Sequence, residues 1–569
     1  MIANLQDAYK SRWLAVDTET NALDPRWDPQ FKCLGISIAF RNELGVMCSE
    51  YYPINHWDSN ETEDTINEVR WLITTHPGLV FHNAKFDLVV LDRMGIKPTG
   101  DYLDTMLMAH WIDENLFSKE LDWLGKRFLG RGKAMTPELD SVINSFGWGL
   151  VPGAFMKKYA STDAELTFDL CMKFMKKWND EGYAGALWAR EQEFLALISR
   201  MERQGIVIDT DFCKEQIDIG ERTMQELLFK VGFNPSSNPQ LGEYLINQMG
   251  LPVVKNTKTG RPSFDKYAMA EYEEILEQRE DATAQNILAY RGWQKTVSSN
   301  YRAYLDLLCT DGRLRPNFLL HGTRTGRLSC RKPNLQQIPK SSDHPWNGGL
   351  KRAFLGSEGY RLLGFDYSNL ELRLAAIYAR EDALIDAFNA GFKPFDELAA
   401  RLNKPRNLCK NLTYAILYGG GINRIKNLFG LDWQAAKELR EEFFRVYPNL
   451  QETIQYASNL SKRRGYVSLW TERRRHFDRR DDDAHKAFNS IIQGGAAELV
   501  KSRQLAVARE IDWDTCRMIL SVHDELVFES ADPKWEPIIK EIMMDVNGLN
   551  PNFHKVAFPV ESKIWGLAA

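Results

Sequence analysis

The sequence predicts a mixed α/β protein of several domains, and three observations support this fold class. At 569 residues the chain is too long for one hydrophobic core, so roughly three or four domains or subdomains are expected. Apolar runs at residues 13–20 and 516–530 predict a buried strand and a two-stranded hairpin. Residues 156–178, by contrast, have the sequence pattern of a long helix.

The composition is that of an ordinary soluble globular protein, with 44% hydrophobic and 26% charged residues. No uninterrupted apolar run approaches the roughly 18 residues that a membrane span requires, and the first residues lack the apolar core of a signal peptide. We therefore expect a cytoplasmic protein without a membrane partner. The eight cysteines are scattered singly, which indicates neither a zinc site nor a disulfide framework.

The charge is uneven along the chain. A net charge of −5 argues against indiscriminate binding of polyanions, but residues 322–332 and 473–480 are dense in arginine. Each run is either a local nucleic-acid contact or a solvated basic loop, and charge alone does not decide between them.

Two acids lie in the strand predicted at residues 13–20. Asp17 and Glu19 are two positions apart, so both carboxylates leave the same side of the strand. Like charges placed so closely repel each other unless a cation lies between them. The strand therefore presents half of a possible metal site.

Three further residues follow on two other predicted elements. Asp87 falls in the first turn of a helix that begins after HNAK, and Tyr159 and Asp163 share one face of the helix at 156–178. Four acids from three elements can converge on two divalent cations, which prefer oxygen ligands. Taken singly, each acid is more simply a surface charge or a helix cap.

In this order, these residues resemble the motifs of the DEDDy class of 3′–5′ proofreading exonucleases. The resemblance implies a ribonuclease H-like fold, a mixed sheet flanked by helices. It also implies that Asp17, Glu19, Asp87 and Asp163 hold two metal ions and that Tyr159 orients the attacking water. Every acid of the motif set is present, so we expect an active exonuclease.

A second constellation lies on the helix predicted at residues 406–418. Arg406, Lys410, Tyr414 and Tyr418 recur every four positions, and four residues turn an α-helix by about 400°, so all four share one face. A face that is cationic at one end and aromatic at the other suits the triphosphate and the base of a nucleotide. The alternative is an amphipathic helix with a solvated basic start and packed tyrosines.

Two more carboxylates end predicted strands in the second half of the chain. Residues 361–366 form a strand that ends at Asp366, and the hairpin at 516–530 turns at His523 and Asp524. Neighbouring strand ends can bring Asp524 beside Asp366, where the pair can hold two Mg²⁺ ions. Mn²⁺ can substitute for Mg²⁺. Alone, the turn would be an ordinary turn with acidic caps.

From about residue 189 to the end, the chain closely resembles family A DNA polymerases, and its compact size resembles their bacteriophage members. The motifs are TGRLSCRKPNLQQIP, DYSNLELR, the helix at 406–418, NSIIQGGAAE and HDE. The resemblance implies a right-hand arrangement of thumb, palm and fingers. The predicted limits are an exonuclease domain at 1–188 and a polymerase domain at 189–569, with the thumb at about 189–305, the palm at about 306–378 and 484–569, and the fingers at about 379–483.

The same resemblance assigns a role to each matching residue. Glu371 is the steric gate against a ribose 2′-hydroxyl, Glu525 is an auxiliary acid near the metals, and Tyr418 stacks at the insertion site. Arg406 and Lys410 clamp the triphosphate, and Lys410 can also protonate pyrophosphate. The contacts with the primer-template are assigned to Arg327, Asn334, Gln336, Asn489, Gln493 and His523. An arginine in the minor groove tests pair geometry without reading sequence.

Two positions depart from the common family pattern. Tyr414 stands where many relatives carry phenylalanine, and its hydroxyl can replace a missing sugar 3′-hydroxyl, so we expect little discrimination against dideoxynucleotides. Phe395 replaces an expected histidine, and the connection from Leu402 to Arg406 is short. One phosphate contact is therefore missing from the predicted site, and Arg406 or a nearby lysine is expected to compensate.

The sequence thus predicts a DNA-directed DNA polymerase with its own proofreading exonuclease, serving phage genome replication. Its expected partners are primer-template DNA, dNTPs and replisome proteins such as a helicase, a primase or a single-strand binding protein. Two alternatives stay open: an RNA polymerase, against which Glu371 argues, and a DNA-binding scaffold with decayed sites, against which the complete carboxylate sets argue.

Overall fold

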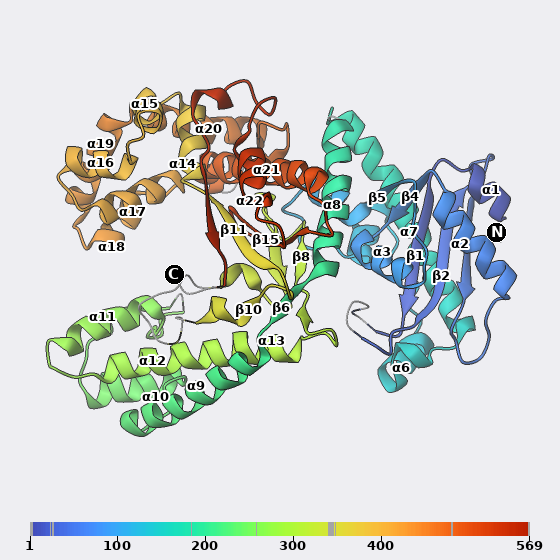
Figure 1. Cartoon of the computed structure of the whole chain (residues 1–569), viewed down its shortest axis with the longest axis horizontal. Helices are drawn as coiled ribbons and strands as arrows, with labels where there is room; N and C mark the ends of the chain where they lie inside the picture. Colours follow the sequence, from blue (N-terminus) through green and yellow to red (C-terminus); the bar gives the residue numbers. More distant parts are fainter. Residues whose placement is uncertain are drawn as a thin grey trace.

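The computed structural model describes residues 4–22, 24, 28–183, 185–257, 259–338, 346, 349–478 and 482–566. Arg479 and Arg480, at the end of the second arginine-dense run, lie outside these residues. A blue N-terminal body lies at one side of the molecule, a green helical arm extends below, and orange helices lie at the opposite upper corner (Figure 1). Yellow and red strands lie between these parts.

The N-terminal body is built on a five-stranded sheet in the order β3-β2-β1-β4-β5. Its strands are β1 (Leu14–Thr20), β2 (Cys33–Arg41), β3 (Met47–Pro53), β4 (Gly78–Phe81) and β5 (Asp101–Asp104). β1, β2 and β3 are antiparallel, whereas β4 and β5 run parallel to β1. The mixed sheet predicted from the first 190 residues is thereby confirmed.

Helices cover this sheet. They are α1 (Leu5–Lys10), α2 (Glu63–Thr75), α3 (Ala84–Arg93), α4 (Thr105–Ile112), α5 (Leu121–Leu124), α6 (Pro137–Phe146) and α7 (Gly153–Asp180), with η1 (Gly125–Leu129) and η2 (Trp148–Leu150) between them. Eight of the nine residues of β2 are buried, which explains its nearly continuous apolar sequence. Long α7 packs across β1, β2 and β3, so its inner face lies against the acids of β1.

The arm below is almost entirely helical. It contains α9 (Thr210–Val231), α10 (Asn238–Leu241), η3 (Gly242–Gln248), α11 (Lys266–Glu277), α12 (Thr283–Thr296), η4 (Val297–Arg302) and α13 (Ala303–Asp306). α8 (Gly185–Gln204) precedes the arm in sequence and lies between the N-terminal body and the central strands (Figure 1). α9 lies against α12 and η4 at Gly220, where an added Cβ would come within 2.5 Å of Val297 Cγ2 and 2.8 Å of the Trp293 ring. Glycine therefore allows the close approach of these helices.

The central strands form an antiparallel sheet in the order β14-β15-β11-β16. They are β11 (Arg361–Tyr367), β14 (Cys516–Val522), β15 (Glu525–Ser530) and β16 (Val560–Ile564). Smaller sheets join β6 (Ile206–Ile208), β7 (Arg313–Leu314) and β10 (Phe354–Leu355), β8 (Asn317–Leu319) and β9 (Ser329–Arg331), and β12 (Tyr466–Ser468) and β13 (Arg474–His476). Short helices η5 (Leu335–Gln337) and η6 (Leu350–Ala353) lie between these strands in sequence.

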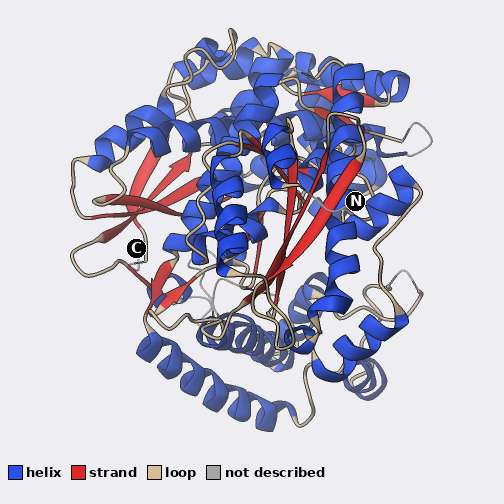
Figure 2. Ribbon diagram, turned by 90° about the vertical axis from the view of Figure 1, so that its right-hand side faces the viewer, coloured by secondary structure: helices blue, strands red, loops and turns tan. Residues whose placement is uncertain are grey.

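The turned view shows helices on several sides of the strands (Figure 2). The remaining helices lie above the central sheet or in the orange group at the upper corner (Figure 1). They are α14 (Leu370–Ala379), α15 (Asp382–Asn389), α16 (Pro394–Leu402), α17 (Arg406–Leu417), α18 (Ile422–Phe429), α19 (Trp433–Val446), α20 (Pro448–Arg464), η7 (Asp482–Lys486), α21 (Ala487–Glu510), α22 (Trp535–Met544) and η8 (Phe553–Lys555). Within the described part of the chain, no helix has the length and apolarity needed to span a bilayer. The predicted domain limits at 188, 305 and 378 fall inside α8, α13 and α14, and they stay predictions.

Candidate active sites

The first candidate site lies where β1, α3 and α7 meet. One carboxylate oxygen from each of Asp17, Glu19 and Asp163 lies within 4.8 Å of the other two. Asp17 and Glu19 share a face of β1, and Asp163 comes from the buried face of α7. Residues almost 150 positions apart in the sequence therefore form one acidic cluster.

Asp87 joins this site from the first turn of α3, as predicted, but in a different way. Its Oδ1 accepts hydrogen bonds from the backbone N–H of Thr18 at 3.0 Å and from the Thr18 hydroxyl at 2.7 Å. Thr18 lies between Asp17 and Glu19, so Asp87 is held beside the cluster. Its carboxylate is not one of the three oxygens that lie within 4.8 Å of one another.

Burial and mutual repulsion shift the acid equilibria of the site. Burial first, and then the charge of Asp163, raises the pKa of Asp17 to about 7. Burial, followed by the charges of Asp17 and Asp163, raises the pKa of Glu19 well above its usual range. Asp163 Oδ1 is buried without a hydrogen-bond partner among the described residues. A divalent cation would reduce the repulsion among these carboxylates and would give Asp163 Oδ1 a partner. These residues therefore fit a metal site.

A lysine that the sequence analysis did not select, Lys133, lies inside this cluster. Its Nζ donates to the Tyr159 hydroxyl at 2.9 Å and forms an ion pair with Asp163. Burial alone would lower the pKa of Lys133, but Asp163 and its neighbours raise it above its usual range. The lysine is therefore charged and faces the acids.

A second unpredicted residue, Asp104, fixes the helix that carries Asp87. Its carboxylate accepts the N–H groups of Asn83 and Ala84 at 3.0 Å each, at the start of α3, and also caps α4 through Met106. Asn83 has φ 68°, in the left-handed region that asparagine tolerates better than most residues. The turn before α3 is thus fixed by an acid from the adjacent strand, β5.

The second candidate site lies at the ends of β11 and β15 in the central sheet. Asp366 pairs with Glu525 across the two strands, and Tyr367 donates its N–H to the backbone oxygen of Asp524 at 3.3 Å. The turn is made by His523 with φ 57°. Burial raises the pKa of Asp524 to about 6, and the charge of Asp366 contributes to this shift. The structure therefore places the two predicted carboxylates close together.

Three side chains beside Asp524 are joined by a hydrogen bond and an ion pair. Tyr418 donates its hydroxyl to Glu371 at 2.6 Å, and Arg327 forms an ion pair with the other oxygen of Glu371. Arg327 Nη2 also lies 3.7 Å from Asp524 Oδ1. Glu371 is only 5% exposed, so it is a buried acid and not a surface charge. Arg327, from the first arginine-dense run, lies in the polymerase candidate site.

The helix predicted at residues 406–418 is α17, with Tyr418 as its C-cap residue. Arg406 and Lys410 are exposed near its start, whereas Tyr414 and Tyr418 are half-buried near its end. The two tyrosine rings lie 5.7 Å apart, centroid to centroid, which confirms that they share one face. Burial raises the pKa of Tyr414 to about 12, with contributions from Glu371 and Asp524. The aromatic end of α17 thus borders the carboxylates.

Phe395, which the sequence predicts to replace a histidine, has a packing role. It is buried on α16, its ring lies 5.9 Å from the Tyr414 ring, and the Arg406 guanidinium lies 5.9 Å from its centroid. Arg406 also pairs with Asp396 at 2.7 Å. Phe395 therefore supports the two residues that the sequence assigns to the nucleotide.

Glu525 follows Asp524 in sequence, but its side chain lies beside two lysines. Its carboxylate pairs with Lys563 at 2.9 Å and lies 3.9 Å from the ammonium of Lys351. A Cβ at Gly364 would come within 2.6 Å of Glu525 Oε1, so the side chain lies over that glycine. The auxiliary acid role of Glu525 stays a prediction.

Three of the predicted DNA contacts, Arg327, Gln336 and His523, line one small cavity beside Asp524. Gln336 is buried and donates to the Ser521 carbonyl at 3.0 Å, and Asn334 caps the short helix η5 that carries it. His523 is exposed at the turn. Asn489 and Gln493 lie one turn apart on α21 and are half-buried, and Asn489 Oδ1 has no partner among the described residues.

The second arginine-dense run holds the two halves of the chain together. Arg473 donates to His110 at 3.1 Å, Arg474 to the Glu181 carbonyl at 2.7 Å, and Arg475 to Glu114 at 2.6 Å. Arg473 and Arg475 are buried. Arg473 and Arg475 are therefore part of an internal contact, and for these two residues both the nucleic-acid contact and the solvated loop are wrong.

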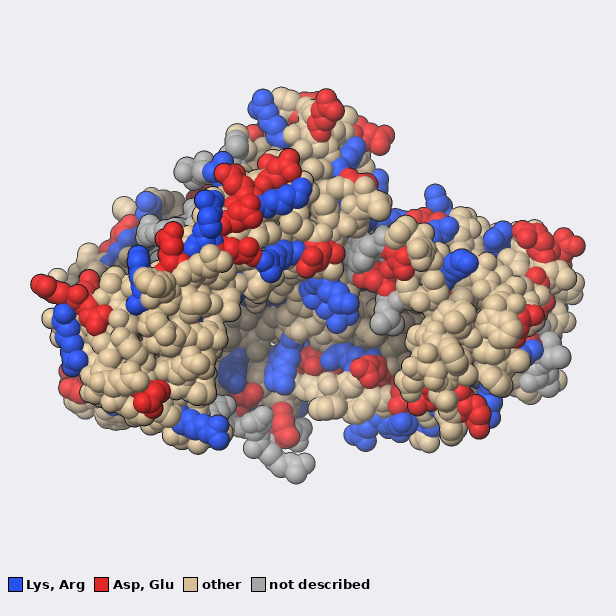
Figure 3. All heavy atoms as spheres, turned by 90° about the horizontal axis from the view of Figure 1, so that it is seen from below, with Lys and Arg blue, Asp and Glu red and all other residues tan. Residues whose placement is uncertain are grey.

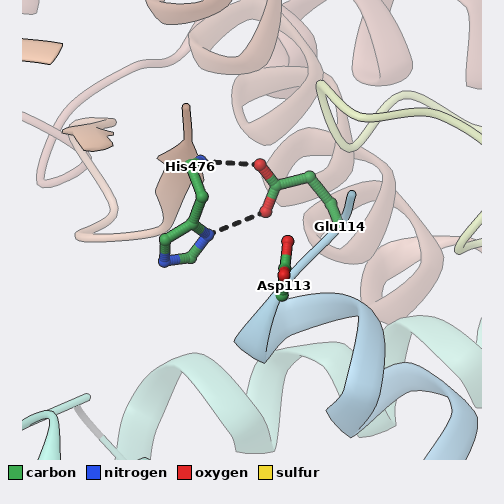
Figure 4. Close-up of side chains that lie close together, drawn as sticks. All are labelled: Asp113, Glu114 and His476. Atoms are coloured by element: carbon green, nitrogen blue, oxygen red, sulfur yellow. Dashed lines mark hydrogen bonds and ion pairs between the residues drawn. The ribbon is translucent and has the colours of Figure 1, made fainter. Parts of the chain in front are cut away.

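Glu114 completes this contact with His476, whose N–H and Nδ1 lie 2.6 and 2.9 Å from its two oxygens (Figure 4). With Asp113, these residues have a spacing that could suit a metal ion. Arg475, however, already supplies the cation that Glu114 requires. The group is an ion-paired contact between the N-terminal body and the hairpin β12–β13.

Seen from below, the molecule is hollowed at its centre, and lysine and arginine side chains lie around the hollow (Figure 3). The net charge is nevertheless −5. Cationic side chains therefore lie around the hollow, beside some acidic ones, although the chain as a whole is negatively charged.

Comparison with known proteins shows to which family the chain belongs. The sequence pattern of DNA polymerase family A matches residues 210–564, and that of the 3′-5′ exonuclease matches residues 2–179. The chain belongs to DNA polymerase family A. The acids of the first site lie in the exonuclease match, and those of the second lie in the family A match.

Relatives are found across bacteria. The chain is 28% identical to DNA polymerase I of Borreliella burgdorferi over 95% of its own length and 61% of the relative's. It is 29% identical to the thermostable DNA polymerase I of Thermus aquaticus over 68% of its length and 48% of the relative's. The chain thus spans about three fifths or less of the length of these family A relatives.

A solved structure shares the fold. The POL domain of Pol1 from M. smegmatis, in complex with DNA primer-template and dNTP, superimposes with a TM-score of 0.82 at 23% identity, covering 98% of this chain and 96% of that one. This likeness confirms the predicted mixed α/β fold.

Proposed function

We propose that this chain is a template-directed DNA polymerase that extends a primer 3′ end with dNTPs and removes terminal nucleotides at a separate 3′–5′ exonuclease site. The observation that carries the proposal is the presence of two distinct carboxylate groups, one around Asp17 and one around Asp524. Membership of family A, the exonuclease match and the DNA-bound structural neighbour support it.

In the polymerase site, Asp366 and Asp524 would hold divalent cations, with Mg²⁺ as the expected ion and Mn²⁺ as a substitute. When bound, such cations lower the pKa of an attacking hydroxyl and neutralise charge on the leaving group. Arg406 and Lys410, exposed at the start of α17, provide the cations that bind the triphosphate. Lys410 can also donate a proton to the departing pyrophosphate.

Selection of the sugar rests on Glu371 in this proposal. Its carboxylate is fixed by Tyr418 and Arg327, so it cannot swing aside at low cost when a 2′-hydroxyl approaches. Tyr418 presents its ring beside this fixed acid, where the incoming base would stack.

In the exonuclease site, Asp17, Glu19 and Asp163, with Asp87 beside them, would hold the metal ions. Tyr159 would orient the attacking water, and the hydrogen bond from Lys133 to its hydroxyl, beside Asp163, supports this role. The primer strand would reach this site after leaving the duplex contacts around Arg327, Asn334, Gln336, Asn489, Gln493 and His523.

The experiment is primer extension and 3′-end degradation with Mg²⁺ for two variants. Asp524→Ala should abolish extension and leave degradation, and Asp17→Ala should do the reverse. Loss of both activities in either folded variant would refute the two-site proposal, and extension with ribonucleotides alone would indicate an RNA polymerase. Phage genome replication and contacts with a helicase, a primase or a single-strand binding protein stay predictions from the sequence.

A further inference from the structure

Lys133 lies at the exonuclease acids without belonging to the exonuclease motifs. It stands in the loop between η1 and α6, and its ammonium contacts Tyr159 and Asp163. Both of these partners lie on α7.

The loop that carries Lys133 is fixed rather than loose. The Lys133 N–H donates to Asp122 Oδ1 at 2.9 Å. A Cβ at the preceding Gly132 would come within 2.4 Å of that same oxygen and 2.7 Å of Lys126 Cε, so the backbone passes very close to α5 and η1. The loop thereby places Lys133 at a defined position beside α7.

Tyr159 is held from two sides. The Lys133 ammonium lies 4.9 Å from the Tyr159 ring centroid and 2.9 Å from its hydroxyl, and the Trp148 ring packs 5.7 Å away. The ring can therefore rotate little, and the lysine determines where the hydroxyl lies. The Lys133 side chain itself is 28% exposed, so its ammonium can be reached from solvent.

DNA must bring a phosphodiester to this acidic cluster, and negative charges repel each other most strongly where water is excluded. Lys133 is a positive charge already placed there. An ammonium binds phosphate as a point charge and can exchange a carboxylate oxygen for a phosphate oxygen without a change of protonation.

We propose that Lys133 is a positioning residue of the exonuclease reaction, which orients the Tyr159 hydroxyl and binds the phosphodiester at the 3′ end of single-stranded DNA. This rests on the exonuclease function proposed above.

The test compares Lys133→Met, the charge-retaining Lys133→Arg and the control Lys126→Met, whose lysine is 67% exposed and pairs with Asp122. Binding of a single-stranded tetranucleotide with a 3′-terminal 2-aminopurine is measured by fluorescence in EDTA over a range of salt. Loss of one phosphate contact should reduce the slope of log K against log salt by about 0.7 in Lys133→Met. Degradation of the same strand in Mg²⁺ should fall about 10- to 100-fold.

Lys133→Arg should restore the salt slope, and Lys126→Met should match the wild type. An unchanged slope in Lys133→Met would overturn the proposal, as would wild-type degradation by that variant. Primer extension, which does not use this site, reports folding, and Lys133→Gln replaces Lys133→Met if extension is lost. If the wild type does not degrade DNA, the proposed function fails, but the salt slope still decides the role of Lys133.

Discussion

The contact between Glu114 and the hairpin β12–β13 gives a sharp prediction for stability. The Glu114 side chain is 2% exposed and that of Arg475 is 9% exposed, so Glu114→Ala leaves a buried guanidinium without its anion. Removing one partner of a buried pair costs about 3–5 kcal/mol. The substitution also removes the two contacts between the Glu114 carboxylate and His476. The expected loss in the free energy of unfolding therefore lies toward the upper end of this range.

The assay is urea unfolding followed by tryptophan fluorescence. With a slope of about 2 kcal/mol per M urea, the expected loss lowers the midpoint of the transition that separates the N-terminal body by roughly 1.5–2.5 M. Glu193→Ala is the matched control, because Glu193 pairs with Arg509 at 2.5 Å but both side chains are largely exposed. A surface pair contributes at most about 1 kcal/mol.

The reasoning would be refuted if the two variants had equal midpoints. A double-mutant cycle with Arg475→Ala separates the pair from its surroundings, and it should give a coupling energy of about 1–3 kcal/mol.

Three further predictions concern the active sites and the pH dependence. Tyr414→Phe should lower the use of dideoxynucleotides relative to dNTPs in competitive primer extension, and strong wild-type rejection that the variant does not change would count against the role of the hydroxyl. Glu371→Ala should reduce discrimination against ribonucleotides at least about tenfold in kcat/KM, because the fixed acid is gone, and unchanged discrimination would contradict the steric gate. Burial, followed by the charge of Arg473, holds the pKa of His110 well below its usual 6.5, so below that pH the unfolded chain binds a proton that the folded chain does not. The free energy of unfolding should therefore fall as pH drops below 6.5, by up to about 1.4 kcal/mol per pH unit for this group. In His110→Gln, the urea midpoint should fall less steeply between pH 6.5 and 5 than in the wild type. Identical slopes in the two proteins would exclude His110 as the cause.

The sequence predicted well those features that depend on local spacing. α17 is recognisable because Arg406, Lys410, Tyr414 and Tyr418 recur every four positions, which keeps successive members on one helix face. The β14–β15 hairpin is recognisable because apolar runs flank a polar turn. Within single elements, the two-residue spacing pairs Asp17 with Glu19, and the four-residue spacing pairs Tyr159 with Asp163. These patterns arise from backbone geometry, which each segment carries by itself.

Features that depend on distant partners could not be predicted in this way. Glu114 and Arg475 are 361 positions apart, and neither has a local pattern that points to the other. From its sequence, the arginine-dense hairpin could be a nucleic-acid contact or a solvated loop, because charge is visible in sequence whereas burial is not. Lys133 was missed for the same reason, since its loop has no periodicity and its role depends on how α7 packs.

The central claim is that the chain forms two separate cation sites. Anomalous diffraction from crystals soaked in Mn²⁺ tests it directly. The account predicts peaks beside Asp366 and Asp524 and beside Asp17, Glu19 and Asp163. Absence of peaks from either carboxylate group at saturating Mn²⁺, or a peak at Glu114 and His476 in its place, would contradict it.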